Sequence, residues 1–212
     1  MPSRSPHVVL VRHGETEWTA RGRHTGRTDV PLTERGREEA GMLAERLRSW
    51  SFGRVLASPL SRALETCRLA GYGEGAEIRD ELMEWDYGRY EGRTTAEIRK
   101  KVAGWSIWSQ GAPDGEAAED VGGRIDPIVQ ELREAEHDVA VFGHGHLLRA
   151  LAARWLELPP AEGRRFALDT TTVSVVGHER ETPALLRWNE DCHLGPRGDA
   201  LLTPATGEDT GA

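Results

Sequence analysis

The chain has 212 residues, of which 38% are hydrophobic and 29% are charged, and its formal net charge is -8 at pH 7. This composition is typical of a globular protein with a heavily charged surface, and the length allows one substantial core. No apolar run is long enough to span a membrane, and the N-terminus lacks the pattern of an export signal. The acidic balance argues against a general nucleic-acid binder, because phosphate backbones favour clustered lysine and arginine.

The cysteine content and the distribution of charge narrow the expectation further. Cys67 and Cys192 are too few to form a disulfide framework in a chain of this size, so we expect a cytoplasmic protein. Residues 1–50 carry nine arginines against seven acidic residues, whereas residues 190–212 carry one arginine against five. An anion could therefore bind near the start of the chain despite the acidic whole.

Short apolar runs alternate with helical patterns along the chain. Strands are predicted at 8–11, 54–57 and 138–142, with further short strands at 77–92, 171–176 and 184–188. Helices are predicted at 33–50, 59–70, from about 95, at 116–135 and from 146 to 155. The glycine-rich run at 71–75 follows a helix instead of a strand, so we interpret it as a loop and not as a dinucleotide-binding motif.

This alternation predicts an α/β fold, a three-layer α/β/α sandwich around a mainly parallel sheet. Residues 1–194 are expected to form a single domain, and residues 195–212, an acidic tail with glycines, are expected to be flexible. Glycines and Pro113 predict an irregular loop at 105–115. Pro127 is expected to kink the helix at 116–135 or to mark its true start.

Polar side chains follow three of the predicted strands. The first strand ends at Arg12 and His13, the second leads to Arg62, and the third leads to His144. Open α/β sheets bind ligands beyond the carboxyl ends of their strands. Buried arginines are costly unless they are paired, and a phosphate would satisfy them. The helix after His144 begins at the same edge, where free N–H groups favour an anion.

These motifs and others resemble, in their order, those of the histidine phosphatase superfamily, which includes cofactor-dependent phosphoglycerate mutases and many small phosphatases. The resemblance covers about residues 8–176 and implies a phosphoglycerate mutase-like fold. It also implies a phosphatase that forms a phosphohistidine and needs no metal or other cofactor. The motifs are Arg12-His13-Gly14-Glu15-Thr16-Glu17-Trp18, Pro31-Leu32-Thr33-Glu34-Arg35-Gly36, Ser58-Pro59-Leu60-Ser61-Arg62-Ala63, Glu84 and Gly143-His144-Gly145.

The resemblance assigns His13 as the nucleophile that attacks phosphorus. A neutral imidazole must present one nitrogen lone pair, so its other nitrogen should donate to a backbone carbonyl or a similar acceptor. By the same resemblance, Arg12, Arg62 and His144 would hold the non-bridging oxygens, over which a loose phosphoryl transition state spreads its charge.

Glu84 is the candidate acid and base. It would protonate the departing alkoxide and then, as a carboxylate, activate water against the phosphohistidine, a double role that requires a moderately raised pKa. Glu81 and Asp86 are neighbouring rivals for this role. His24, by contrast, is more simply interpreted as a loop histidine than as a catalyst.

The resemblance also favours a class of substrate. Residues 85–92, 105–108 and 143–146 look like the branch that contains fungal sedoheptulose-bisphosphatase, which implies a sugar phosphate or bisphosphate. Arg21, Arg23, Arg27 or Arg149 would be available for a second phosphate. The substrate contacts that we expect are Thr19, Thr25, Gly26, Ser58, Tyr87, Gly145, His146 and Arg149.

Thr19 is a departure from the pattern of this superfamily. Many relatives have an asparagine at this position, and a threonine hydroxyl lacks the reach and the second donor of an amide.

Three alternatives remain open at this stage. A mutase would return the phosphoryl group to the substrate, but mutases of this superfamily typically have a longer segment between the acid and the second histidine. A metal hydrolase could use His13, His24, His144 and His146, but these lack the one-turn spacing of a paired-histidine site. A phosphate-binding partner protein could have lost catalysis. The expected partner is a small phosphorylated metabolite, without nucleic acid or membrane, and a homo-oligomer is compatible with the sequence.

Overall fold

The structure, a computed structural model, describes residues 6–195 as strands and helices in alternation. The strands are β1 (Val8–Arg12), β2 (Arg54–Ala57), β3 (Glu77–Ile78), β4 (Val139–Gly143), β5 (Val173–Glu179) and β6 (Thr182–Glu190). The helices are α1 (Glu17–Ala20), α2 (Glu34–Leu47), α3 (Ser61–Leu69), α4 (Thr95–Arg99), α5 (Ile107–Gln110), α6 (Ala118–Arg133) and α7 (Gly145–Trp155). Short 3-10 turns include Gly88–Tyr90 and Pro160–Arg165.

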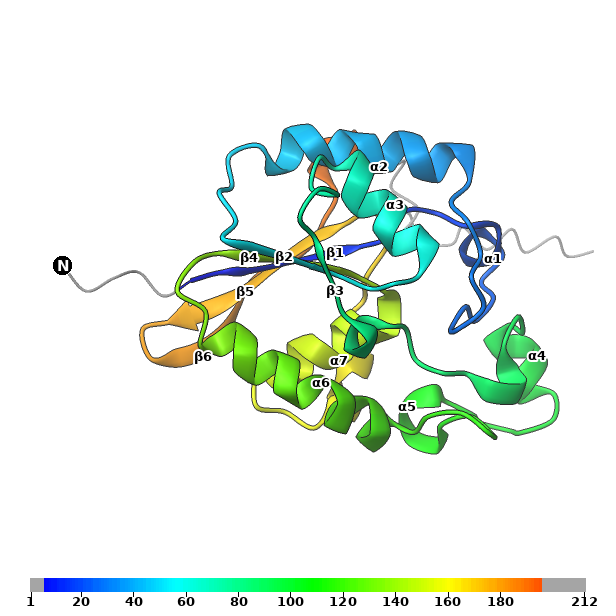
Figure 1. The fold of residues 1–212 in the computed structure, drawn as a ribbon. Helices are drawn as coiled ribbons and strands as arrows, with labels where there is room; N and C mark the ends of the chain where they lie inside the picture. The colour runs from blue at the N-terminus through cyan, green and yellow to red at the C-terminus, as the bar shows by residue number, and fades with distance from the viewer. Residues whose placement is uncertain (1–5, 196–212) are drawn as a thin grey trace, which may run out of the picture.

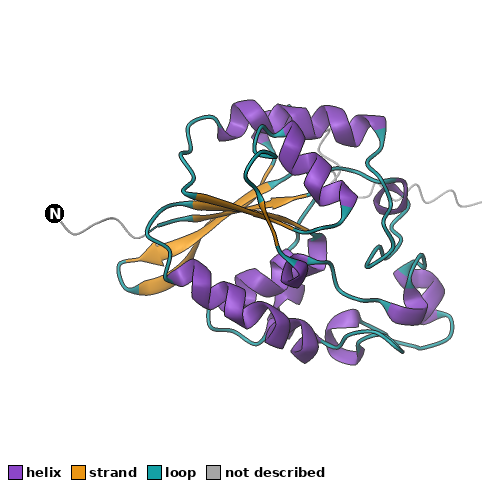
Figure 2. Ribbon diagram, in the orientation of Figure 1, coloured by secondary structure: helices purple, strands orange, loops and turns teal. Residues whose placement is uncertain are grey.

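The strands form one sheet in the order β3-β2-β4-β1-β5-β6. Strands β3, β2, β4 and β1 pair in parallel, whereas β5 is antiparallel to both β1 and β6. Helices α2 and α3 cover one face of the sheet, and α6 and α7 cover the other (Figure 1; Figure 2). The predicted α/β sandwich with three layers and a mainly parallel sheet is confirmed.

Strand β1 lies in the middle of the sheet, and its side chains alternate between two hydrophobic clusters. Val8 and Leu10 belong to the cluster that includes residues of α6 and α7, and Val9 and Val11 belong to the cluster with α2 and α3. None of the four is more than 1% exposed. Because β1 is held from both faces and both edges, the residues that follow it have a fixed position, and the His13 N–H donates to the Gly143 carbonyl at 3.0 Å.

The prediction of an irregular loop at 105–115 is wrong in part, because α5 occupies residues 107–110. Ile107 and Trp108 are buried there, so tertiary packing overrides the local signal from the glycines. The turn ends at Gly111, whose φ of 62° lies in the left-handed region that favours glycine.

Pro127 does not mark the start of a helix, because α6 runs through it. A proline leaves the carbonyl four residues earlier without its N–H donor, and that carbonyl belongs to Gly123. Both Gly123 and Pro127 are exposed, so water can reach this carbonyl and the helix continues.

The C-terminal strands extend beyond the limits predicted for them. The segments predicted at 171–176 and 184–188 form a hairpin from Val173 to Glu190, which turns at Arg180 with a φ of 57°. The flexible tail predicted at 195–212 lies, except for Gly195, outside the described residues, and the domain limits of 1–194 stay a prediction. Between residues 6 and 195, no helix has both the length and the apolarity that a membrane crossing requires.

The N-terminus of α2 packs directly against the loop that follows β1. A Cβ on Gly36 would lie 2.2 Å from the carbonyl oxygen of Glu15, and a Cβ on Gly14 would lie 2.5 Å from that of Gly36. The N-cap Thr33 fixes the same contact, because its N–H donates to the Glu15 carbonyl at 2.9 Å. The loop beside His13 therefore depends on two glycines at a contact between backbones.

We predict that Gly36→Ala destabilises the protein despite the higher helix propensity of alanine. The new methyl group must displace backbone, at a cost of about 1–3 kcal/mol. Gly41→Ala in the same helix is the matched control, because among the described residues no atom beyond its chain neighbours and its own helix backbone lies within 4 Å of its Cβ position. It should stabilise the protein by about 0.5–1 kcal/mol. Urea unfolding of both variants measures the difference, and equal effects would contradict the packing constraint.

Candidate active site

A cleft opens beyond the carboxyl ends of β1 and β4, with about 420 Å³ of empty space that includes its opening to solvent. Most of the residues predicted for the site contribute to its wall. The lining residues are Arg12, His13, Thr19, Arg23, His24, Thr25, Glu84, Tyr87, Gly145, His146, Arg149 and Leu168. Among these lining residues, Glu84 alone carries a carboxylate, so the wall has an excess of positive charge.

The His13 side chain is 3% exposed, and its Nδ1 lies 2.7 Å from the carbonyl oxygen of Gly14. A carbonyl can only accept, so Nδ1 carries the proton and Nε2 of the neutral ring keeps its lone pair. The backbone acceptor predicted for His13 is therefore present. Burial lowers the pKa of His13 well below its usual value, and the charges of Arg62 and Arg12 lower it further. Near neutral pH the ring is the unprotonated base that a nucleophile must be.

Arg12 lies beside His13 at the end of β1 with donors to spare. Its Nη1 donates to the Leu168 carbonyl, but its buried Nε finds no hydrogen-bond partner among the described residues. A Cβ at Gly145 would lie only 3.2 Å from the Arg12 Cζ, so this glycine lets the guanidinium approach the start of α7. A buried guanidinium with an unpaired donor is suited to an anionic ligand.

Glu84 occupies the N-terminus of α7. Its Oε2 accepts from the His146 N–H at 3.0 Å, and its Oε1 accepts from the N–H groups of Leu147 at 2.8 Å and Trp85 at 2.9 Å. These bonds fix the carboxyl group at the edge of the cleft, with the side chain buried. We expected free N–H groups at the start of α7 to bind an anionic ligand. For the N–H groups of His146 and Leu147 this is wrong, because both already donate to Glu84.

The rival carboxylates of Glu81 and Asp86 do not line the cleft. Glu81 pairs with Arg79 at 3.4 Å, and Asp86 accepts from the Gly88 N–H at 2.8 Å. Of the three candidates, the structure brings only Glu84 to the same cavity as His13.

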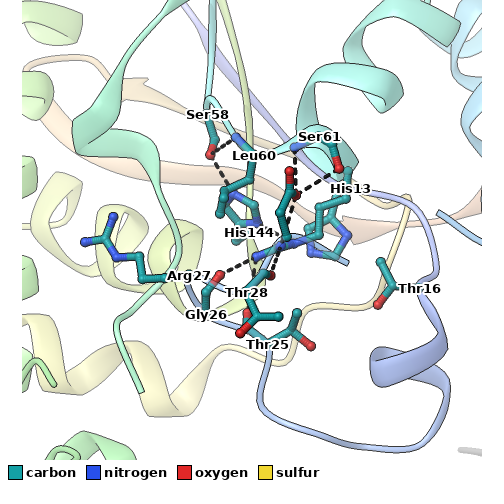
Figure 3. Close-up of polar contacts among 12 residues, drawn as sticks. His13, Thr16, Thr25, Gly26, Arg27, Thr28, Ser58, Leu60, Ser61 and His144 are labelled. Atoms are coloured by element: carbon teal, nitrogen blue, oxygen red, sulfur yellow. Dashed lines mark hydrogen bonds and ion pairs between the residues drawn. The ribbon is translucent and has the colours of Figure 1, made fainter. Parts of the chain in front are cut away.

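Four of the predicted site residues lie behind the cleft wall instead of on it. Arg62, which is fully buried, donates from Nη2 to the Gly26 carbonyl at 2.7 Å and from Nε to His144 Nδ1 at 3.2 Å. His144 Nε2 lies 2.7 Å from Ser58 Oγ, and its ring centroid lies 5.1 Å from that of His13 (Figure 3). Both ring nitrogens of His144 thus have protein partners, and Arg62 connects the loop at Gly26 to them.

Another part of the cleft wall is made of aromatic and imidazole rings. Tyr87 Oη lies 2.5 Å from His146 Nδ1, and the His146 ring packs against Trp108 at 5.1 Å between centroids. His24 packs against Tyr87 at 4.7 Å, so it lines the site although its sequence context suggests only a loop histidine. Burial lowers its pKa to about 4. His146 and Arg149, one turn apart on α7, both line the cleft.

The structure distinguishes between the arginines that could hold a second phosphate. Arg21 pairs with Glu17 at 2.8 Å and Arg27 lies 3.8 Å from Glu116, and neither lines the cleft. Arg23 and Arg149 line the cleft. Neither has a carboxylate partner in the described part of the chain, and each donates instead to backbone carbonyls.

Thr19 lines the cleft, but its hydroxyl closes the capping box of α1. The Oγ1 atom accepts from the Thr16 N–H at 2.8 Å and donates to the Thr16 carbonyl at 3.0 Å. Its donor is therefore already used within the helix end. Leu168 was not predicted and contributes a backbone carbonyl to Arg12, which no side-chain pattern could have indicated.

Residues 6–195 contain no group of three or more histidine, cysteine, aspartate or glutamate side chains placed to hold a metal ion. The four histidines considered for a metal site are instead directed to other partners. Nδ1 of His13 faces a backbone carbonyl, and Nε2 of His24 lies 3.1 Å from Thr95 Oγ1.

Comparisons with known proteins agree with this geometry. The family model described as histidine phosphatase superfamily (branch 1) matches residues 8–191. The chain is 42% identical over 183 residues to an acid phosphatase of Mycobacterium tuberculosis, covering 84% of this chain and 90% of that protein. It is 35% identical over 190 residues to sedoheptulose 1,7-bisphosphatase of Saccharomyces cerevisiae, covering 74% of this chain and 70% of that protein. A solved structure of an open reading frame product from Mycobacterium tuberculosis is similar with a TM-score of 0.84 and 40% identity, covering 88% and 98% of the two chains.

We predict that the protein is less stable at pH 5.5 than at pH 7.5. In the folded state, burial lowers the pKa values of His13, His24, His144 and His146 below the usual 6.5. The unfolded chain therefore binds more protons as the pH falls through 6.5, and stability that is present above this pH is lost below it. Each histidine should contribute about 1 kcal/mol to the loss at pH 5.5.

Urea unfolding at the two pH values measures this loss. His24→Gln should reduce the difference by about 1 kcal/mol, because one lowered group is removed. His137→Gln is the matched control at an exposed histidine and should leave the difference as it is. A free energy of unfolding that is constant between pH 5.5 and 7.5 would contradict the prediction.

Proposed function

The chain belongs to the histidine phosphatase superfamily (branch 1), and we propose that it is a phosphatase that hydrolyses small phosphomonoesters through a phosphohistidine on His13. The observation that carries the proposal is the state of this imidazole. Its Nδ1 is tied to the Gly14 carbonyl, so the lone pair of Nε2 is free in a cleft that also holds Arg12 and Glu84.

In the first step, His13 Nε2 attacks phosphorus in line with the ester oxygen. The new P–N bond forms as the P–O bond to the leaving group breaks, and protonated Glu84 gives its proton to the departing alkoxide. The Arg12 guanidinium, with its unpaired Nε, lies where it can stabilise the charge on the non-bridging oxygens.

In the second step, water attacks the phosphohistidine from the side that the alkoxide has left. Glu84, now a carboxylate, takes a proton from this water, and the P–N bond breaks to release inorganic phosphate. His13 returns to the neutral form with its proton on Nδ1. Glu84 is again protonated and ready for the next ester.

Arg62 and His144 have a supporting role in this proposal. Arg62 donates to the carbonyls of the loop at 25–28 and to one nitrogen of His144. Arg12 and Arg62 therefore act on the phosphate from different distances. Arg12 faces the cleft, whereas Arg62 adds positive potential from behind its wall.

We infer that the substrate is a sugar phosphate or bisphosphate. Arg23 and Arg149 lie on the cleft wall without carboxylate partners among residues 6–195, which fits a second anionic group on the leaving side. A relative of 35% identity is named as a sugar bisphosphatase. We further propose a cytoplasmic location, for which Cys67 and Cys192, both free thiols, are the support.

We predict that His13→Ala lowers kcat for phosphate release from p-nitrophenyl phosphate and sugar phosphates by roughly 10³-fold or more, because the nucleophile is lost. The fold should persist, as circular dichroism would show. His137→Ala, at an exposed histidine, is the matched control and should keep full activity. A His13→Ala variant with near-native turnover would overturn the proposal.

The same assay tests the alternatives. Activity should persist in excess chelator, and loss there would favour a metal hydrolase. Isomerisation of 3-phosphoglycerate without release of phosphate would favour a mutase. No turnover of any ester by the native protein would favour a phosphate-binding protein without catalysis.

We predict that Glu84→Gln lowers kcat for alkyl phosphates by about 10²-fold, because the amide cannot transfer the proton. A p-nitrophenolate leaving group needs no such proton. With p-nitrophenyl phosphate, the variant should therefore release a burst of p-nitrophenolate equal to the enzyme concentration and then stall as the phosphohistidine.

Glu81→Gln is the matched control in the neighbouring turn, since its carboxylate pairs with Arg79 outside the cleft. It should keep native rates with both kinds of ester. The assignment of the acid would be wrong if Glu81→Gln showed the loss and Glu84→Gln did not.

A further inference from the structure

The ring-lined wall of the cleft contains a hydrogen bond that the proposed mechanism does not use. Tyr87 Oη and His146 Nδ1 are 2.5 Å apart, and both residues line the cavity. Tyr87 is 1% exposed, so its hydroxyl cannot exchange this partner for bulk water. The direction of this bond decides which nitrogen of His146 carries the proton.

The surroundings of the pair show which group donates. The charged groups near the Tyr87 hydroxyl are two carboxylates, Glu84 and Glu91, and two cations, Arg12 and Arg149. The cations cannot accept a hydrogen bond, and the carboxylates interact with the hydroxyl only at longer range. The hydroxyl has no hydrogen-bond partner besides His146 among residues 6–195. A buried O–H group must donate to some acceptor, so it donates to His146 Nδ1.

His146 is neutral in this position. Burial lowers its pKa well below the usual value, and the charge of Arg149 lowers it further, with smaller effects from His24 and Arg12. A neutral ring that accepts at Nδ1 carries its only proton on Nε2. Packing against Trp85 and Trp108 holds the ring in place.

We infer that Tyr87 is a positioning residue that fixes His146 as an Nε2–H donor on the leaving-group side of the cleft. This inference rests on the proposed function and deepens it. His146 Nε2–H and the Arg149 guanidinium, one helical turn apart, then form a wall of donors. Such a wall selects a leaving group with an oxyanion or another strong acceptor, such as the second phosphate of a sugar bisphosphate, over an apolar alcohol.

Arg149 is held so that it completes this wall. Its Nε donates to the Gly163 carbonyl at 3.1 Å, and its guanidinium lies over the Trp108 ring at 4.8 Å. A Cβ on Gly163 would lie 2.8 Å from the Arg149 carbonyl oxygen and 2.8 Å from the Trp108 ring. The segment around Gly163 therefore packs closely against both Arg149 and Trp108, beside His146.

The first test reads the tautomer directly and requires no activity. Two-bond ¹H–¹⁵N correlation spectra of the ¹⁵N-labelled protein should show His146 with a proton on Nε2 and none on Nδ1 near pH 7.5. In Tyr87→Phe, the His146 signals should move toward a mixture of both tautomers. A native spectrum with the proton on Nδ1 would overturn the inference, as would a spectrum that Tyr87→Phe leaves unchanged.

The second test measures selectivity as the ratio of kcat/KM for fructose 1,6-bisphosphate to kcat/KM for phenyl phosphate. Tyr87→Phe should lower this ratio about two- to threefold, mainly through KM for the bisphosphate, because a mixture of tautomers presents the Nε2–H donor only part of the time. Tyr90→Phe is the matched control, because Tyr90 lies in the 3-10 turn that follows Tyr87, packs on Trp105 and does not line the cleft. It should leave the ratio unchanged, and an equal fall in both variants would contradict the inference.

A rescue variant separates a tautomer effect from loss of packing. His146→Gln retains an N–H donor at the ε position, so it should keep the ratio near the native value, whereas His146→Leu removes the donor and should lower the ratio about tenfold. In the His146→Gln background, Tyr87→Phe should have no further effect. If it lowered the ratio there as much as in the native background, Tyr87 would act by another route. Native protein without activity on either ester would refute the proposed function, while the spectra would still decide the tautomer.

Discussion

The buried guanidinium of Arg62 connects the parts of the site that come from different regions of the chain. It donates to the carbonyls of Gly26 at 2.7 Å and Thr28 at 3.0 Å, and to His144 at 3.2 Å. A fully buried cation is costly by several kcal/mol unless its donors are paired, so helix α3, the loop at 25–28 and the end of β4 must be arranged together. The wall of the cleft is thereby supported from behind, before any ligand binds.

Burial, together with this concentration of positive charge, explains the state of the imidazoles. Burial lowers the pKa values of His13 and His144, and the nearby charges of Arg62 and Arg12 lower them further. His13, the proposed nucleophile, is thus neutral next to cations that can attract a phosphate. Glu84 contributes a carboxylate to the cleft wall, and backbone N–H groups at the start of α7 stabilise it there by donating hydrogen bonds.

The sequence predicted the layers of the fold, and the ends of β1, β2 and β4 to within one residue, because these depend on apolar runs that a window of five residues can show. It also brought Arg12, His13 and Glu84 to one cavity through the motifs that carry the resemblance. It could not show that Arg62 and His144 lie behind the wall, because that placement depends on hydrogen bonds to loop carbonyls far away in the chain. Helix α5 was missed for a similar reason, since the packing of Ile107 and Trp108 against the rest of the protein favours it.

The two ends of the cleft come from different kinds of structure. The phosphate end is built from residues that directly follow β1 and β4, inside the packed sheet, whereas the ring-lined end depends on Tyr87, Trp108 and the turn at 160–165. The short helices α4 and α5 of this second region lie outside the layers of the sandwich (Figure 1). Tyr87 and Trp108 nevertheless belong to the same buried hydrophobic cluster as Val8 and Leu10 of β1. A substitution that alters the ring-lined end must therefore preserve side-chain volume in this cluster, so the acceptance of a new leaving group is coupled to the stability of the central strand.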